Sequence, residues 1–179
     1  MKKPFYLITL FILLSFTLYL FLLNDGFCKK NIVKSLPFNE LDHLSLSLED
    51  QNLASLALSQ PYTYLSCGSQ CYVFKSQDNR FVLKFFKDKK WLTKCILSKL
   101  PPFVFINKYR ERRIARMERT LRRTLESSLV SFTIFKNETG TIYTNLSSKN
   151  QIGSNVTVTD RLGLMHVLDL SEIPFIIQY

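Results

Sequence analysis

The segment FVLKFF, residues 81–86, is apolar except for Lys84. A charged side chain inside such a segment faces either water or a negative group, because burying an unpaired charge is strongly unfavourable. An amine held opposite an acid would be suited to binding phosphate groups or to forming a structural ion pair. The first question that this sequence raises is therefore which group Lys84 faces.

Glu118 is the acid that the pattern favours as the partner of Lys84. It lies in a predicted helix over residues 104–129 and shares the helix's apolar face. The apolar residues of that face are Ile114, Leu121 and Leu125. A buried carboxylate needs a cation, so we expect Glu118 to point at the sheet and to meet Lys84. The alternative is that Lys84 reaches solvent and Glu118 pairs with Arg122 at i, i+4.

Gly68 lies in a turn between two β-rich runs and is the third candidate residue. Glycine lets backbone N–H groups approach phosphates without a Cβ atom in the way. Gly68, Lys84 and Glu118 therefore form the candidate nucleotide site or structural ion pair, and we expect no other cofactor.

The cysteines and histidines do not indicate a metal site. The four cysteines, at positions 28, 67, 71 and 95, lack the paired spacing of zinc ligands, and His43 and His166 have no ligand-type neighbours. No nucleophile and base stand at a telling spacing either. We therefore expect no metal and no catalytic residue, and the sequence does not indicate an enzyme.

The segment from about residue 60 to 179 resembles the small lobe of a protein kinase. That lobe has a glycine-rich hairpin, a third strand carrying a lysine, one helix and two further strands. Residues 81–84 stand where the family has V-A-I-K, and residues 66–73 where it has G-x-G-x-x-G-x-V, with only Gly68 of the three glycines kept. The resemblance implies that Lys84 contacts phosphates and pairs with a helix glutamate, either Glu118 or Glu111.

The chain departs from that family in the parts that carry out catalysis. It contains neither H-R-D-x-x-x-x-N nor D-F-G, and the contexts of Asp160 and Asp169 match neither motif. The base and the magnesium-holding pair are therefore missing. The resemblance implies a truncated, non-catalytic binding or scaffold module of the pseudokinase kind, with nucleotide binding left open.

The predicted helix also carries a dense set of cations, which supports a second function. They are Lys108, Arg110, Arg112, Arg113, Arg116, Arg119, Arg122 and Arg123, in a chain of net charge +10. We take Arg112, Arg116 and Arg119 as candidate anion-binding residues that dock an acidic protein or an anionic lipid surface. Only Tyr109 interleaves the arginines, which does not favour nucleic acid. The alternative is an ordinary solvated face.

The first 28 residues predict a membrane anchor. The apolar run 5–23 would rise about 28 Å as a helix, which is close to the thickness of the hydrocarbon core. A cleaved signal sequence is the alternative, although residues 24–30 offer no A-x-A site. Lysines flank the run on both sides, at positions 2 and 3 and at 29, 30 and 34, so the charge pattern does not orient the span. We predict a single-pass membrane protein.

The rest of the chain predicts an α+β domain over residues 61–179 behind a juxtamembrane linker over 29–60 that holds a short helix. We expect strands at 62–67, 71–75, 80–86, 131–136, 141–145, 156–159, 162–170 and 174–179. Hairpin connections give an antiparallel sheet with one long helix packed on it. Cys67 and Cys71 would close the first hairpin and face each other across it.

Overall fold

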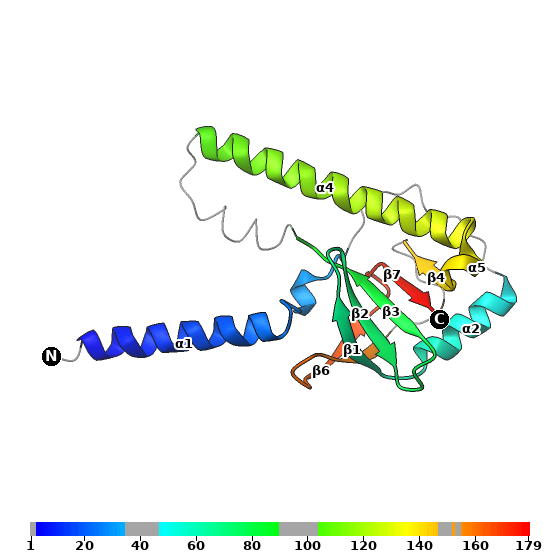
Figure 1. The fold of residues 1–179 in the computed structure, drawn as a ribbon, viewed down its shortest axis with the longest axis horizontal. Coiled ribbons are helices and arrows are strands. Elements are labelled where there is room, and N and C mark those ends of the chain that lie inside the picture. Colours follow the sequence, from blue (N-terminus) through cyan, green and yellow to red (C-terminus); the bar gives the residue numbers. More distant parts are fainter. Residues whose placement is uncertain (1–2, 35–46, 90–103, 147–151, 153–154) are drawn as a thin grey trace.

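The computed structural model describes residues 3–34, 47–89, 104–146, 152 and 155–179. It confirms the predicted α+β class: a curled seven-stranded sheet carries one long helix, and an apolar helix projects from it at the N-terminal end (Figure 1). In the described part of the chain, Tyr6–Leu23 is the one stretch long and apolar enough to cross a membrane, and a signal sequence would pass the same test.

The sheet is built from short strands, each of which overlaps a strand predicted from the sequence. They are β1 (Tyr62–Cys67), β2 (Cys71–Ser76), β3 (Val82–Phe86), β4 (Thr141–Asn145), β5 (Asn155–Thr159), β6 (Met165–Asp169) and β7 (Phe175–Gln178). Their order across the sheet is β4-β7-β3-β2-β1-β5-β6. The last strand in the sequence therefore lies between two strands that precede it by many residues.

The sheet is mixed, which corrects the prediction of an antiparallel one. β1 and β5 run parallel, whereas the other neighbouring pairs are antiparallel. β4 lies at one edge of the sheet, whereas β5, the next strand in the sequence, lies beside β6 at the opposite edge. A chain that changes sides in this way can enter beside β1 in the same direction, which a tight hairpin cannot do.

The helices are α1 (Lys3–Leu23), the short 3₁₀ turn η1 (Lys29–Asn31), α2 (Leu48–Leu58), α4 (Val104–Thr133) and α5 (Lys136–Thr139). The short helix expected before Pro61 is α2. It begins at a Ser47 cap, whose hydroxyl accepts a hydrogen bond from the Asp50 backbone N–H at 3.1 Å.

The strand predicted at 131–136 is wrong, because this segment is helical. No glycine or proline interrupts the chain before Gly140, and α4 continues to Thr133. The hydroxyls of Ser131 and Thr133 bond to carbonyls four residues back, which lets β-favouring residue types remain in a helix. The residues between the strands predicted at 131–136 and 141–145 form α5, which ends at Gly140 in the left-handed conformation (φ +63°).

Two hydrophobic clusters cover the two faces of the sheet. The larger cluster includes Leu83 and Phe85 of β3 and the inner side of α2. The smaller one holds Val33, Phe86, Leu125, Leu146 and Ile176, with Leu121 and Leu129 packed against it. The α4 residues of this cluster all lie in the C-terminal half of the helix, so the N-terminal half of α4 projects past the sheet (Figure 1).

Candidate anion-binding surface

The residues that follow α1 fold onto the domain. A turn formed by Asp25 (φ +51°) and Gly26 (φ +68°) ends the helix, and the Gly26 N–H bonds to the Phe21 carbonyl at 2.9 Å. A Cβ atom on Gly26 would approach the Phe21 ring to 3.3 Å. We call residues 24–33 the neck, because they join the apolar helix to the sheet.

Phe27 anchors the neck in the larger cluster. Its side chain is 4% exposed and its ring makes edge contacts with Tyr72, Phe74 and His166 at centroid distances of 5.1 to 5.4 Å. The Tyr72 hydroxyl donates to the Gly26 carbonyl at 2.8 Å. Ile32 is also buried, so the linker predicted from residue 29 begins inside a packed segment.

Asp160 joins the neck to the β5–β6 turn. Its Oδ2 atom accepts a hydrogen bond from the Asn24 amide at 3.1 Å and lies 2.8 Å from the Nε2 atom of His166. Its Oδ1 atom accepts from the backbone N–H groups of Leu162 and Leu164, both at 2.9 Å. Burial raises the pKa of Asp160, but these hydrogen bonds outweigh it and hold the pKa below its ordinary value.

Asp25 makes a second link between the neck and the sheet. It accepts a hydrogen bond from the Tyr64 hydroxyl and pairs with Arg161 at 3.0 Å. The Tyr64 hydrogen bond is the main reason why the pKa of Asp25 lies below its ordinary value. Both ends of the neck turn are therefore tied to the domain, and α1 leaves the domain in a fixed direction.

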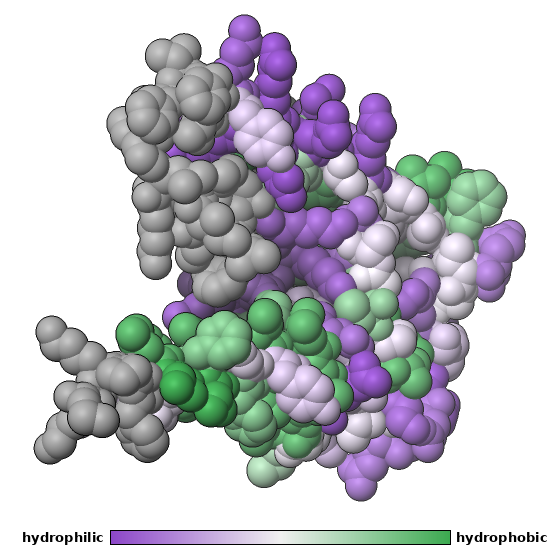
Figure 2. Space-filling model, turned by 60° about the vertical axis from the view of Figure 1, so that its left-hand side comes forward, coloured by the Kyte–Doolittle hydropathy of each residue, from purple (hydrophilic) through white to green (hydrophobic). Residues whose placement is uncertain are grey.

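The arginines of α4 lie on the same side of the sheet as α1. In Figure 1 the N-terminal half of α4 and the helix α1 both project from that side. Figure 2, with this side turned forward, shows apolar side chains on α1 and hydrophilic side chains towards α4. Arg112, Arg116 and Arg119 are all exposed, as both the anion-binding prediction and the alternative of a solvated face require.

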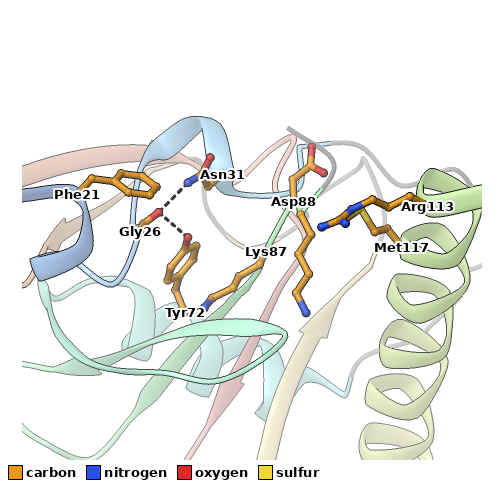
Figure 3. Close-up of a pocket in the computed structure, with 9 residues that line it drawn as sticks. Phe21, Gly26, Asn31, Tyr72, Lys87, Asp88, Arg113 and Met117 are labelled. Atoms are coloured by element: carbon orange, nitrogen blue, oxygen red, sulfur yellow. Dashed lines mark hydrogen bonds between the residues drawn. The ribbon is translucent and has the colours of Figure 1, made fainter. Parts of the chain in front are cut away.

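A cavity of about 320 Å³ opens between the neck and α4 (Figure 3). We call it the neck cavity. It is lined by Phe21, Gly26, Asn31, Tyr72, Lys87, Asp88, Lys89, Arg113 and Met117. Arg113 and Met117 also line a second cavity of about 410 Å³, together with Tyr109, Arg112 and Arg116. The two cavities therefore connect the cationic surface of α4 with the end of α1.

The structure does not bring Lys84 and Glu118 together. Lys84 is half-buried on β3, on the sheet face that also carries Phe86 and Ile176 and is covered by α4. Glu118 is exposed on α4, so the predicted inward orientation of Glu118 is wrong. Among the described residues no ion pair joins the two. At Glu118 the helix α4 has not yet reached the part that packs on the sheet. Helical spacing alone does not show at which residue that packing begins.

Gly68 lies in the β1–β2 turn as predicted, and its N–H bonds to the Cys71 carbonyl at 3.0 Å. Cys67 and Cys71 do not face each other, which corrects the expected pairing. Cys67 is opposite Tyr72 in the register and packs against the larger cluster, whereas Cys71 packs against the smaller one. The two thiols lie on opposite faces of the sheet and are both free.

Sequence reasoning missed the residues of the neck. Asn24, Asp25 and Gly26 gave the signal of a turn directly after the apolar run, but only the fold shows that Asp160 and Tyr72 hold this turn. No group of metal-ligating side chains is found in the described ranges. Comparison with family models, curated proteins and solved structures finds no match to this chain.

Proposed function

We propose that this chain is a single-pass membrane protein whose domain lies against the anionic surface of the same membrane through the arginines of α4. The observation that supports this most directly is geometric. α1 and the arginine-bearing half of α4 project from the same side of the sheet, and the neck fixes the direction in which α1 leaves. α4 runs roughly alongside α1 and its N-terminal end points the same way (Figure 1), so a bilayer crossed by α1 would meet the N-terminal half of α4.

The neck supports an anchor that is retained. Cleavage within residues 24–28, directly after the apolar run, would remove or sever the segment that contains Asn24 and Phe27. Both side chains are buried in contact with the domain. A domain that had lost them would expose Tyr72 and Phe74, so we expect the membrane-purified protein to have an intact mass that includes residues 3–23.

The β5–β6 turn supports contact on the other side of the span. Its first residues, Asp160 and Arg161, bond to Asn24 and Asp25, so the turn lies beside the end of α1. The end of the turn and the start of β6 expose apolar side chains: Leu164 is 57% and Met165 77% exposed. Apolar side chains next to a membrane span are suited to the lipid interface.

The charges of α4 favour anionic lipid over an acidic protein, because the anchor already holds the membrane beside them. Each Lys or Arg near an anionic leaflet contributes about 1 kcal/mol, so Arg112, Arg116 and Arg119 would contribute about 3 kcal/mol at low salt. This corresponds to roughly a hundredfold change in an equilibrium constant. Anionic lipid is characteristic of the cytoplasmic leaflet, so the proposal places the domain in the cytoplasm.

The test is hydrogen exchange of the full chain in lipid nanodiscs. We expect the amides of residues 107–120 to exchange more slowly in discs that contain phosphatidylserine than in discs of phosphatidylcholine alone. The slowing should disappear in high salt, because screening weakens the attraction. The triple variant Arg112→Gln, Arg116→Gln, Arg119→Gln should exchange alike in both kinds of disc.

The matched control removes the same charge elsewhere. Lys75→Gln, Arg80→Gln and Arg122→Gln together also lower the net charge by three, at the sheet and further along α4, where Arg122 already pairs with Glu126 at 3.0 Å. This variant should keep the dependence on phosphatidylserine. Equal exchange of residues 107–120 in both discs for the unmodified protein would refute the proposal.

A kinase-like small lobe is the second candidate. The order of elements supports it: a hairpin turning at Gly68, a strand with Lys84, the helix α4, and two further strands, β4 and β7, which pair with each other, with β5 and β6 added between them in the sequence. Lys84 also lies on the face covered by α4. The exposed position of Glu118 counts against the family's ion pair.

Nucleotide binding is the test of this second candidate. We would expect adenosine triphosphate to raise the unfolding temperature of the full chain in detergent, and Lys84→Ala to abolish that rise. The control is Lys75→Ala, a half-buried lysine on the neighbouring strand. If the nucleotide has no effect on the unmodified protein, this candidate fails and the membrane-docking proposal is unaffected.

A further inference from the structure

We propose that the neck cavity binds the phosphate of one anionic phospholipid whose headgroup also carries a hydrogen-bond donor, such as phosphatidylserine. This inference deepens the proposed function and rests on it, because it assumes that the domain lies at its own membrane. It adds a defined site for a single lipid molecule to the diffuse attraction between α4 and the bilayer.

The position of the cavity fits a lipid headgroup. Phe21 lies in the last turns of α1 and forms one side of the cavity, while Arg113 and Met117 of α4 form the opposite side (Figure 3). The hydrocarbon core ends where a span of this length ends, and headgroups lie directly beyond it. A phosphate of the surrounding leaflet could therefore enter the cavity while it stays at the depth of the headgroups.

The charges of the cavity fit a phosphate. Among the described residues that line it, Lys87, Lys89 and Arg113 are cations and Asp88 is the single carboxylate. Cations gathered from two separate elements repel one another, and an anion between them would stabilise the arrangement. Arginine and lysine are also the side chains that bind phosphate most effectively in proteins.

Two of these cations are held in place by neighbours. The Lys87 amine lies 4.5 Å from the centroid of the Tyr72 ring and contacts the Cys67 sulfur. The Arg113 guanidinium donates to the Tyr109 hydroxyl at 2.8 Å. Side chains that are already positioned lose less conformational entropy when a ligand binds.

Asn31 indicates a headgroup that can donate a hydrogen bond. Its amide nitrogen donates to the Gly26 carbonyl at 2.7 Å, but its buried Oδ1 atom has no hydrogen-bond partner in the described part of the chain. A buried acceptor without a donor is unfavourable. The ammonium of serine or the hydroxyl of glycerol beside the phosphate could supply the donor, whereas the quaternary ammonium of choline has no N–H.

The experiment counts the lipids that stay on the full chain after its release from detergent into a native mass spectrometer. With phosphatidylserine at stoichiometric concentration, we expect one lipid to be retained. Phosphatidylcholine at the same concentration should be retained at least tenfold less. The variant Lys89→Gln, Arg113→Gln should lose the retained phosphatidylserine by at least tenfold. Both of these side chains are exposed, so their loss should leave the unfolding temperature unchanged.

The control variant Lys75→Gln, Arg80→Gln removes two cations from the sheet and should retain the lipid. Soluble glycerophosphoserine and inorganic phosphate are added as competitors to identify the source of the phosphate. Displacement of the lipid by millimolar inorganic phosphate would mean that the cavity takes free phosphate, and it would overturn the proposal. So would equal retention of the two lipids, or equal retention by the test and control variants.

Failure of this site and failure of the proposed function give different results. If the exchange of residues 107–120 depends on phosphatidylserine but no single lipid is retained, α4 docks by diffuse attraction and the neck cavity is not a lipid site. If one phosphatidylserine is retained but the exchange does not change, the cavity binds lipid and the docking of α4 is refuted.

Discussion

The neck and the N-terminal half of α4 both lie beside the apolar helix α1, but they are stabilised in opposite ways. The neck buries Asn24, Phe27, Ile32 and Val33, and its turn is held by Asp160, Tyr64 and Tyr72. In the N-terminal half of α4 the side chains that the structure describes, those of residues 107–118, belong to neither hydrophobic cluster, and four of them are arginines. The neck therefore has its partners within the chain, whereas our proposal gives α4 a partner outside it.

In the proposed membrane protein this difference separates two roles. The neck sets the orientation of the domain relative to α1, and its contacts are short-range, both apolar and hydrogen-bonded. The arginines act over a longer range and depend on salt. Substitutions in the neck should therefore change the free energy of unfolding, and substitutions in the exposed half of α4 should change binding with little effect on folding.

The largest effect should come from removing the Phe27 ring. Phe27→Ala would leave a cavity among Tyr72, Phe74 and His166, and we expect it to lower the free energy of unfolding by about 3 to 5 kcal/mol. The control, Tyr109→Ala, truncates an exposed ring on α4 and should change this free energy by about 0.5 kcal/mol or less. Urea denaturation of the full chain in detergent measures both. Equal losses would erase the distinction between the two regions.

The second effect should depend on pH. The pKa of Asp160 is below its ordinary value in the folded state, so its stabilising contribution is present above about pH 4 and is lost as the pH falls through the folded pKa. Asp160→Asn should lower the free energy of unfolding at pH 7 by about 1.5 to 3 kcal/mol. It should also reduce the further loss between pH 4 and pH 2. Urea denaturation at a series of pH values measures this.

The control for that series is Glu138→Gln, which removes one exposed carboxylate far from the neck in sequence. It should keep the acid-dependent loss of the unmodified protein. If Asp160→Asn shows the same acid dependence as this control, Asp160 does not hold the neck in the way described.

The smallest effect should come from the neck turn. Gly26→Ala places a side chain at a φ of +68° and brings a Cβ atom to 3.3 Å from the Phe21 ring. Gly163→Ala places one at a φ of +81° with no atom within 4 Å. The backbone strain of about 1 to 2 kcal/mol is shared by both variants. A larger loss for Gly26→Ala in thermal unfolding would isolate the contact between neck and span, and equal losses would contradict it.

Local patterns predicted most of the elements. The glycine turn at Gly68, the alternating runs beside it and the apolar face of the long helix placed β1, β2, β3 and α4 close to their observed bounds. Local patterns could not show that β5 runs parallel to β1, because this depends on where the chain enters the sheet. They also misplaced residues 131–136, because α4 continues to Thr133 and the hydroxyls of Ser131 and Thr133 bond to carbonyls within the helix.

The positions of the candidate site residues could be predicted only in part, because local patterns do not show tertiary contacts. Arginine-rich spacing correctly indicated an exposed cationic helix, since charge on a helix surface is a local property. The pairing of Lys84 with Glu118 failed because it required knowing how much of α4 the sheet covers. The neck was missed because its partners, such as Asp160 and Asn24, are more than a hundred residues apart in the sequence.

The central position of β7 has a consequence for biosynthesis. β3 and β4 both pair with β7, so neither strand can complete its hydrogen bonds until the ribosome has made residues 175–178. By then, if the protein is anchored as we propose, α1 has long been available for insertion into the membrane. The nascent domain would wait with two open strand edges next to the bilayer, a state prone to wrong pairing. Tethering by α1 would keep neighbouring nascent chains apart during that interval.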